Sequence, residues 1–243
     1  DQIRIPADSP LRNVLKIQNP LGEDTSIMRT IALPSMLEIL ARNNAYHNKA
    51  AKLYEVAKVY LPQEGQKLPQ EPKMLMLGTY GTAETFFTLK GELEAIFAGL
   101  RMKKAEYTAE KNNPSYHPGR CAKVTVDSVE IGVMGQVHPL VAKNYGIDSE
   151  VYCAELNFTK MLTLMLPDAT YTALPKYPSV SRDLAVVCEE AVTVAQAEKV
   201  IASAAGKLLR DVKLFDIYRG VGVPAGKKSM AFSLELRADD RTL

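Results

Sequence analysis

Residues 173–184 read Ala-Leu-Pro-Lys-Tyr-Pro-Ser-Val-Ser-Arg-Asp-Leu, and this stretch decides how the chain is organised. Its two prolines fix φ at their own positions and favour extended backbone at the residues that precede them. A helix or a central strand does not pass easily through such a segment. We therefore expect a linker arm at residues 173–182, which joins a first domain at residues 1–172 to a second domain at residues 183–243.

The composition is typical of a folded protein with a polar surface. Of the 243 residues, 47% are hydrophobic and 24% are charged. The sequence contains no run of eighteen apolar residues, which a membrane-spanning helix would need. The first residues lack the pattern of a signal peptide. Because Cys121, Cys153 and Cys188 lack metal-ligand spacing, we expect reduced thiols in a cytoplasmic protein. The missing initiating methionine favours a piece of a longer chain. The net charge of +2 is too small to indicate nucleic-acid binding, so any RNA contact requires a local patch.

The first part mixes helix and strand patterns. Residues 34–44 begin with a proline and carry an apolar stripe, which predicts a helix. Residues 52–61 are partly apolar on both faces, so we expect a central strand buried on two sides. The clearest predicted helix, 85–100, has a continuous apolar face. Further strands are expected at 14–17, 74–78, 122–126, 130–134 and 151–157, and short helices at 138–145 and 158–166. The strands at 122–126 and 130–134 should form a hairpin that turns at Asp127 and Ser128.

The second part is short and regular. Residues 183–188 form a predicted strand, and Thr193 with Gln196 has the spacing of a capping box that opens a helix. The helix should turn six residues inward: Val194, Ala197, Val200, Ile201, Ala204 and Leu208. Residues 211–218 and 228–237 alternate as two more strands, the first with Val212, Leu214, Asp216 and Tyr218 on one face. This βαββ order is most of a ferredoxin-like domain, with the strand at 183–188 at a sheet edge.

Four blocks of the second part, in order, resemble the ferredoxin-fold anticodon-binding domain that closes the β subunit of bacterial phenylalanyl-tRNA synthetase. The blocks are Tyr-Pro-Ser-Val-Ser-Arg-Asp-Leu at 177–184, Leu-Phe-Asp-Ile-Tyr-Arg-Gly at 214–220, Gly-Lys-Lys-Ser-Met-Ala-Phe-Ser at 226–233 and Arg-Ala-Asp-Asp-Arg-Thr-Leu at 237–243. That family's domain ends with a further helix and strand. The resemblance therefore implies a βαββ(αβ) domain that is truncated here at its C-terminal end.

The first part resembles the catalytic-like domain of the same subunit. The similar segments are 19–37, which includes Met-Arg-Thr-Ile-Ala-Leu-Pro-Ser-Met-Leu, then Leu-Tyr-Glu-Val-Ala-Lys-Val-Tyr at 53–60, Tyr-His-Pro-Gly-Arg-Cys-Ala at 116–122 and Ile-Gly-Val-Met-Gly-Gln-Val-His-Pro at 131–139. The resemblance covers essentially the whole chain. It implies an α+β fold, with a class II aminoacyl-tRNA synthetase-like mixed or antiparallel sheet flanked by helices.

The resemblance also implies partners and a reaction. The family assembles as an (αβ)₂ heterotetramer with a catalytic α subunit, and the holoenzyme uses ATP and Mg²⁺ to attach phenylalanine to tRNA(Phe). An adenylate site needs cationic and carboxylate groups on adjacent strands. No Phe-Arg-x-Glu segment precedes the strand at 52–61, and the sequence Leu-Thr-Leu-Met-Leu-Pro at 162–167 has no glycine-rich block that ends in arginine. We therefore expect no catalytic residue, no metal and no cofactor in this chain, and no membrane association.

Basic residues gather in the second part. Arg219, Lys227 and Lys228 surround one hairpin turn, and Lys176 and Arg182 lie near the start of the domain. The residues alone are typical of an ordinary solvated hairpin. With the resemblance, they become candidates for contact with an anticodon stem-loop, and Tyr218 could stack on a base. The candidate RNA-binding residues are Lys176, Arg182, Tyr218, Arg219, Lys227 and Lys228.

Three other residues are better explained by structure than by chemistry. His117 and His138 each precede a proline and lack partners at metal-ligand spacing, so they are interpreted as turn or helix-start residues. For Arg29 we expect a buried ion pair or an inter-subunit contact.

Two alternatives stay open at this point. One is an autonomous ligase of the lipoate or biotin type, although its glycine-rich loop is not found. The other is an ACT-like module that binds a small molecule, attached to an unrelated core.

Overall fold

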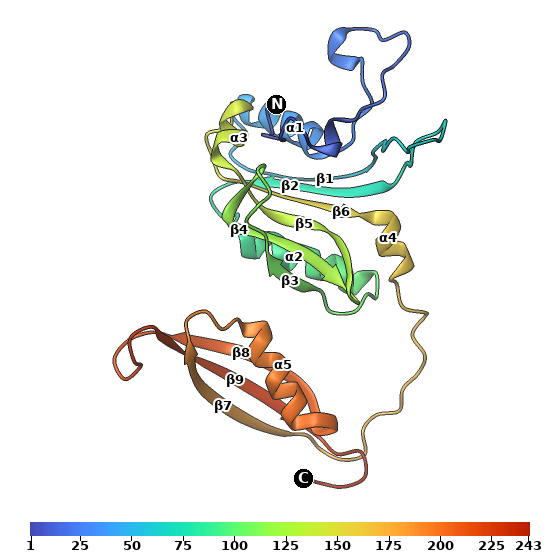
Figure 1. Ribbon diagram of the computed structural model, residues 1–243. Helices are drawn as coiled ribbons and strands as arrows, with labels where there is room; N and C mark the ends of the chain where they lie inside the picture. Colours follow the sequence, from blue (N-terminus) through green and yellow to red (C-terminus); the bar gives the residue numbers. More distant parts are fainter. The chain divides into compact units, whose positions relative to one another are not determined.

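The computed structural model describes residues 1–243, apart from the side chain of Asp24. The chain forms two compact units, Asp1–Asp168 and Ala169–Leu243 (Figure 1). Strand β7 of the second unit begins at Val180, three residues before the predicted strand. No helix among the described residues is both long enough and apolar enough to cross a membrane.

The first unit is built on a six-stranded antiparallel sheet with the order β1-β2-β6-β5-β4-β3. Helix α1 lies against β1 and β2 on one face, whereas α2 and α4 lie on the other face (Figure 1). Each face therefore has its own apolar core. The strands are β1 (Ala51–Lys58), β2 (Lys73–Tyr80), β3 (Glu106–Ala109), β4 (Tyr116–Val126), β5 (Val129–Val137) and β6 (Val151–Asn157). The helices are α1 (Leu33–Ala45), α2 (Phe86–Gly99), α3 (Pro139–Asn144) and α4 (Phe158–Thr163), with 3₁₀ turns at Pro10–Arg12 and Glu23–Thr25.

Local sequence explains the two long helices, and both predictions are confirmed. Helix α1 carries Pro34 in its first turn, where a missing N–H costs no hydrogen bond. Its apolar stripe is buried against the sheet. Helix α2 begins after Thr85, whose hydroxyl accepts from the N–H of Thr88 while the Thr88 hydroxyl accepts from the N–H of Thr85. This reciprocal cap fixes where α2 begins.

The prediction of a central strand at residues 52–61 is wrong. Strand β1 is an edge strand that pairs only with β2. Its side chains alternate between half-buried and exposed, and Tyr54 and Val56 are 78% and 47% exposed. The second apolar face misled the prediction because these side chains lie beside a surface groove rather than in a core. The strand predicted at 14–17 is also wrong, since it amounts to one bridge between Lys16 and Ile27.

Glycine is required at one position where β5 pairs with β6. Gly132 has φ +156°, and a Cβ atom there would lie 2.1 Å from the carbonyl oxygen of Glu155. Only a residue without a side chain allows the two strands to pair at this point. The preceding hairpin turns at Asp127 and Ser128, both with positive φ, as the sequence predicts.

The second unit contains β7 (Val180–Glu189), α5 (Val194–Ala205), a 3₁₀ turn at Gly206–Leu208, β8 (Leu209–Tyr218) and β9 (Lys227–Leu236). Its sheet has the order β7-β9-β8, so the βαββ prediction and the edge position of β7 are confirmed (Figure 1). The capping box of Thr193 and Gln196 is also confirmed. The inward face predicted for this helix is confirmed only in part, because Val194, Ala197 and Ile201 are half-buried whereas the other three residues are exposed. Val200, for example, is 69% exposed.

The alternation predicted for residues 211–218 is interrupted. Leu214 pairs with Phe232 and Asp216 pairs with Ala231, so Phe215 is an extra residue in a β-bulge. The bulge changes the face on which the following residues lie. Tyr218 therefore shares a face with its partner Ser229, and not with Val212 and Leu214 as predicted.

Candidate nucleic-acid interface

The two faces of the three-stranded sheet have opposite character. The face toward α5 buries Met230 and Phe232. The residues that alternate with them on β9 are small, namely Ser229, Ala231 and Ser233, and each is only partly buried. Their partners on β7 are Asp183, Ala185 and Val187, of which Val187 is apolar and 54% exposed. The result is a shallow sheet face that no described helix of the second unit covers.

Tyr218 lies at one end of this open face. It pairs with Ser229, and its side chain is 47% exposed. Its hydroxyl donates to the carbonyl oxygen of Val221 at 3.3 Å, which fixes the ring beside the turn that follows β8. A half-exposed ring next to small side chains is a surface on which a base can stack.

Three of the predicted cations gather at the same end of the sheet. The guanidinium of Arg219 donates to both carboxylate oxygens of Glu190, with Nη2–Oε1 at 2.6 Å and Nε–Oε2 at 3.1 Å. Lys227 pairs with Glu189 at 3.1 Å. Lys228 is buried, and its ammonium donates to the backbone oxygen of Glu190 at 2.9 Å.

These contacts reduce the field of the cations. The hydrogen bond from Arg219 lowers the pKa of Glu190, and the same bond raises the pKa of Arg219, so both groups stay charged at neutral pH. An RNA phosphate would have to compete with Glu190 for the guanidinium. The cluster is therefore an ion-paired surface rather than a free basic patch.

Two predicted residues lie elsewhere. Arg182 pairs with Leu234 near the start of β7. It is six residues from Cys188, the neighbour of Lys228, which is about 20 Å along a strand. Lys176 is exposed in the segment before β7. The structure thus brings together Tyr218, Arg219, Lys227 and Lys228 but leaves Lys176 and Arg182 apart from them.

Sequence reasoning missed Glu189 and Glu190. Each lies on the other side of α5 in the sequence, and Glu190 is 29 residues from Arg219. The signal that could have found them is the pair of adjacent glutamates at the end of the strand predicted at 183–188, since β7 and β9 pair in antiparallel register there.

Several charged groups of the first unit make contacts within that unit. Of the two outcomes expected for Arg29, the ion pair forms, because its Nη2 lies 3.0 Å from Glu55 Oε1, but the pair is half-buried rather than buried. The other guanidinium nitrogens donate to the hydroxyl of Ser35 and the carbonyl of Lys58. Buried Glu155 accepts from the backbone N–H of Ala32 at 2.8 Å, at the start of α1. Burial raises the pKa of Glu155 to about 7, although this bond opposes the shift.

The two histidines close local turns, as the sequence predicts. His117 Nδ1 accepts from the N–H of Gly119, and His138 Nδ1 accepts from the N–H of Leu140 as the cap of α3. Burial lowers the pKa of His138. Within the described residues, no three His, Cys, Asp or Glu side chains gather as a metal site would require.

The fold and these surfaces define an α+β protein that joins an antiparallel sheet domain to a ferredoxin-fold domain of the anticodon-binding class. The family model for that class, the ferredoxin-fold anticodon binding domain, matches residues 175–243. The model for the CLM domain of the phenylalanyl tRNA synthetase beta chain matches residues 1–158. The chain belongs to the phenylalanyl-tRNA synthetase β chain family. The two matches fit this family and not the lipoate-type ligase or the ACT-like module.

Curated relatives agree over the full length of the chain. Three proteins named phenylalanine–tRNA ligase beta subunit, from Clostridium tetani, Clostridium acetobutylicum and Symbiobacterium thermophilum, are 45%, 42% and 37% identical. Each alignment covers 100% of this chain. It covers 31% of the first two relatives and 28% of the third, so the chain spans about a third of their length.

Proposed function

We propose that this chain is the part of a phenylalanine–tRNA ligase β subunit that supports the catalytic α subunit and binds tRNA(Phe). The first unit acts as a scaffold without chemistry of its own, with the class II synthetase-like fold. The second unit contributes RNA contacts as a ferredoxin-like domain, of which this chain contains one α-helix and three strands among its described residues. The holoenzyme charges tRNA with phenylalanine in the cytoplasm, as an (αβ)₂ heterotetramer that uses ATP and Mg²⁺.

The observation that carries the RNA proposal is the uncovered sheet face that ends at Tyr218. Its small side chains let a planar base approach the backbone closely, and the exposed ring offers a stacking partner. Arg219 and Lys227 lie at the same end and can exchange their glutamate partners for phosphate oxygens. Lys228 supports the turn from its buried position, while Lys176 and Arg182 would contact a different part of the RNA.

The observation that supports a scaffold is how the charged groups of the first unit are used. Arg29 is held by Glu55 and Ser35, and Glu155 binds the N-terminal end of α1. Groups that hold a helix in place are not free to bind a phosphate or a metal ion. This arrangement favours a structural role for the unit.

Fluorescence anisotropy with a labelled anticodon stem-loop of tRNA(Phe) at low salt tests the RNA proposal. Tyr218→Ala should weaken binding by about tenfold, since one base stack is lost. Arg219→Ala should weaken binding and reduce the slope of log affinity against log salt by about 0.7. Tyr46→Ala and Arg42→Ala, at exposed positions of the first unit, are the matched controls and should change nothing. Equal affinities for all variants would refute the proposed surface.

Phenylalanine-dependent ATP–pyrophosphate exchange tests the scaffold proposal. The chain alone should be inactive, and it should co-migrate with a bacterial α subunit in gel filtration. Exchange by the isolated chain would contradict a scaffold role.

A further inference from the structure

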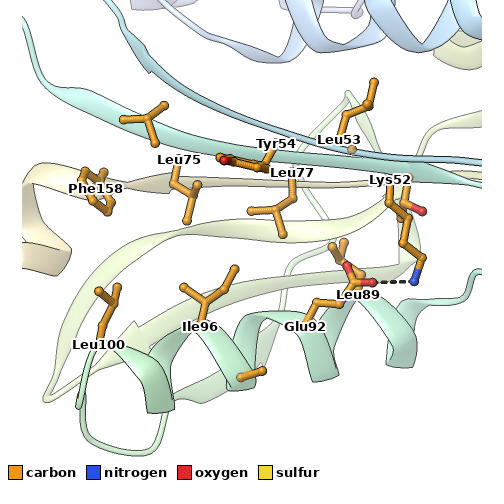
Figure 2. A pocket seen from close by; sticks show the side chains of 14 residues that line it. Lys52, Leu53, Tyr54, Leu75, Leu77, Leu89, Glu92, Ile96, Leu100 and Phe158 are labelled. Carbon is orange, nitrogen blue, oxygen red and sulfur yellow. Dashed lines mark hydrogen bonds and ion pairs between the residues drawn. The ribbon is translucent and has the colours of Figure 1, made fainter.

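A groove lies between the edge of the first unit's sheet and helix α2. It has a volume of about 550 Å³, within the range of pockets that hold small ligands. The floor is formed by β1 and β2, one wall by α2, and one end by Phe158 at the start of α4 (Figure 2).

The groove exists because α2 does not cover the whole sheet. Helix α2 packs on β5 and β6, whereas α1 packs on β1 and β2 from the opposite face. The α2-facing side of β1 and β2 is therefore covered only by α4, which contacts β2. Leu75 and Leu77 point from the sheet toward α2, and Ile96 points back toward them (Figure 2).

One end of the groove is charged. The ammonium of Lys52 lies 2.6 Å from Glu92 Oε1 and 3.1 Å from Glu84 Oε1. These hydrogen bonds raise the pKa of Lys52, so the ammonium stays protonated. Two carboxylates share one cation here, and the end of the groove therefore carries a net negative charge. Helix α2 rises about 12 Å between Glu92 and Leu100, so the charged end is well separated from the apolar end.

A buried hydroxyl marks the same end as a binding site. Thr79 lines the groove, is only 2% exposed, and faces the same side of the sheet as its cross-strand partner Lys52. Its Oγ1 has no hydrogen-bond partner among the described residues. Buried polar groups in proteins are normally paired, so this hydroxyl is available to a partner from outside the chain, either a water molecule or a polar group of a ligand.

We propose that the groove binds a small amphiphilic cation, a compound with an ammonium group on an apolar body. The ammonium would add the second positive charge that Glu84 and Glu92 lack, and would donate to the hydroxyl of Thr79. The apolar body would lie along Leu75, Leu77 and Ile96 toward Phe158. This assignment concerns the first unit and is independent of RNA binding by the second.

Methyl NMR of the 243-residue chain, titrated with 4-phenylbutylamine, tests the assignment. The methyl signals of Leu77, Ile96 and Leu100 should shift saturably. The neutral isostere 4-phenylbutanol should bind at least tenfold more weakly, and the anion 4-phenylbutyrate should cause no saturable shift. Equal affinity for the amine and the alcohol, or no shift with the amine, would overturn the assignment. Shifts that depend on protein concentration and not on the amine would place a second copy of the chain in the groove, and would overturn it as well.

Two pairs of variants on α2 separate the site from its surroundings. Glu92→Gln should weaken the amine at least tenfold and leave the alcohol unchanged, whereas Glu94→Gln, which faces Lys90 outside the groove, should affect neither. Ala95→Phe should fill the groove and abolish binding, whereas Ala98→Phe should not. Both alanines are exposed, so the fold should tolerate either change. Unaltered binding to Glu92→Gln or to Ala95→Phe would rule out the groove as the site.

Discussion

The two sheets of this chain differ in how their apolar faces are covered. The six-stranded sheet has helices on both faces and two separate cores, one with α1 and α3 and one with α2 and α4. The three-stranded sheet has one helix, and Met230 and Phe232 are its only buried apolar strand residues among those described. Both faces of the first sheet are thus covered by helices of the same unit, whereas one face of the second sheet has no helix of its own unit over it.

Charged groups follow the same division. In the first unit Glu155 is buried and Arg29 is half-buried, and both hold the start of α1. In the second unit Arg219 and Glu190 form their pair in solvent, where an ion pair contributes little to stability and can be exchanged for another partner. The difference fits the proposed scaffold role of the first unit and the proposed RNA binding by the second.

The largest effect on stability is expected at Gly132, where β5 pairs with β6. Gly132→Ala would place its Cβ 2.1 Å from the carbonyl oxygen of Glu155, and should lower the free energy of unfolding of the first unit by more than about 4 kcal/mol. Gly91→Ala on α2, where the added methyl meets open space, is the control and should be neutral or slightly stabilising. Chemical denaturation followed by NMR amide signals of each unit would measure both. A mild effect of Gly132→Ala would show that the two strands can separate there.

The thin core of the second unit should make it sensitive to a single truncation. Phe232→Ala removes a fully buried ring from β9, the central strand of the sheet. The change should lower the free energy of unfolding by about 3 kcal/mol or more. We expect the amide signals of β7, β8 and β9 to lose their dispersion while those of β6 remain. Val200→Ala, at an exposed position on α5, should change little. Parallel loss of both units would show that they do not fold separately.

A smaller effect concerns pH and only the first unit. Burial raises the pKa of Glu155 from 4.5 to about 7, so the folded state binds this proton more tightly than the unfolded state. The cost of the buried charge is fully present above pH 7 and is relieved as the pH falls from 7 toward 4.5. The first unit should therefore gain about 1–3 kcal/mol between pH 8 and pH 5. Urea titrations of wild type, Glu155→Gln and the exposed control Glu64→Gln would measure it. Only Glu155→Gln should lose the pH dependence, and a wild type that weakens toward pH 5 would contradict the assignment.

The smallest expected effect distinguishes two possible partners of Arg219, the carboxylate of Glu190 and an RNA phosphate. Glu190→Gln removes its anionic partner without removing the cation. If the guanidinium binds phosphate, this variant should bind the anticodon stem-loop a few-fold more tightly than wild type, with the stability nearly unchanged. Glu235→Gln, which is exposed on the same sheet and at the far end of β9, is the control. Weaker binding by Glu190→Gln would show that the ion pair itself forms the binding surface.

Much of this fold is readable from local patterns. A continuous apolar face located α2, a capping box located α5, and turn residues located the hairpin of β4 and β5. The position of a strand within a sheet was not readable. Apolar side chains such as Tyr54 and Val56 look the same in sequence whether they face a core or a groove. Strand β3 was missed because its four residues carry no clear alternation.

The candidate site was predicted only in part, for a similar reason. Tyr218, Arg219, Lys227 and Lys228 are close in sequence and meet at one turn. The glutamates that pair with two of them come from β7 and the residue after it, and the bulge at Phe215 sets the face on which Tyr218 lies. Register and bulges depend on long-range pairing, which a single sequence does not reveal.

An NMR titration of the ¹⁵N-labelled chain with the anticodon stem-loop of tRNA(Phe) tests the division of roles most directly. We predict that amide chemical shifts change at Tyr218, Ser229 and Ala231, on the open face and its charged end. The amide chemical shifts of the first unit should not change. Changes concentrated on the first unit's sheet, or no change at any RNA concentration, would contradict the account.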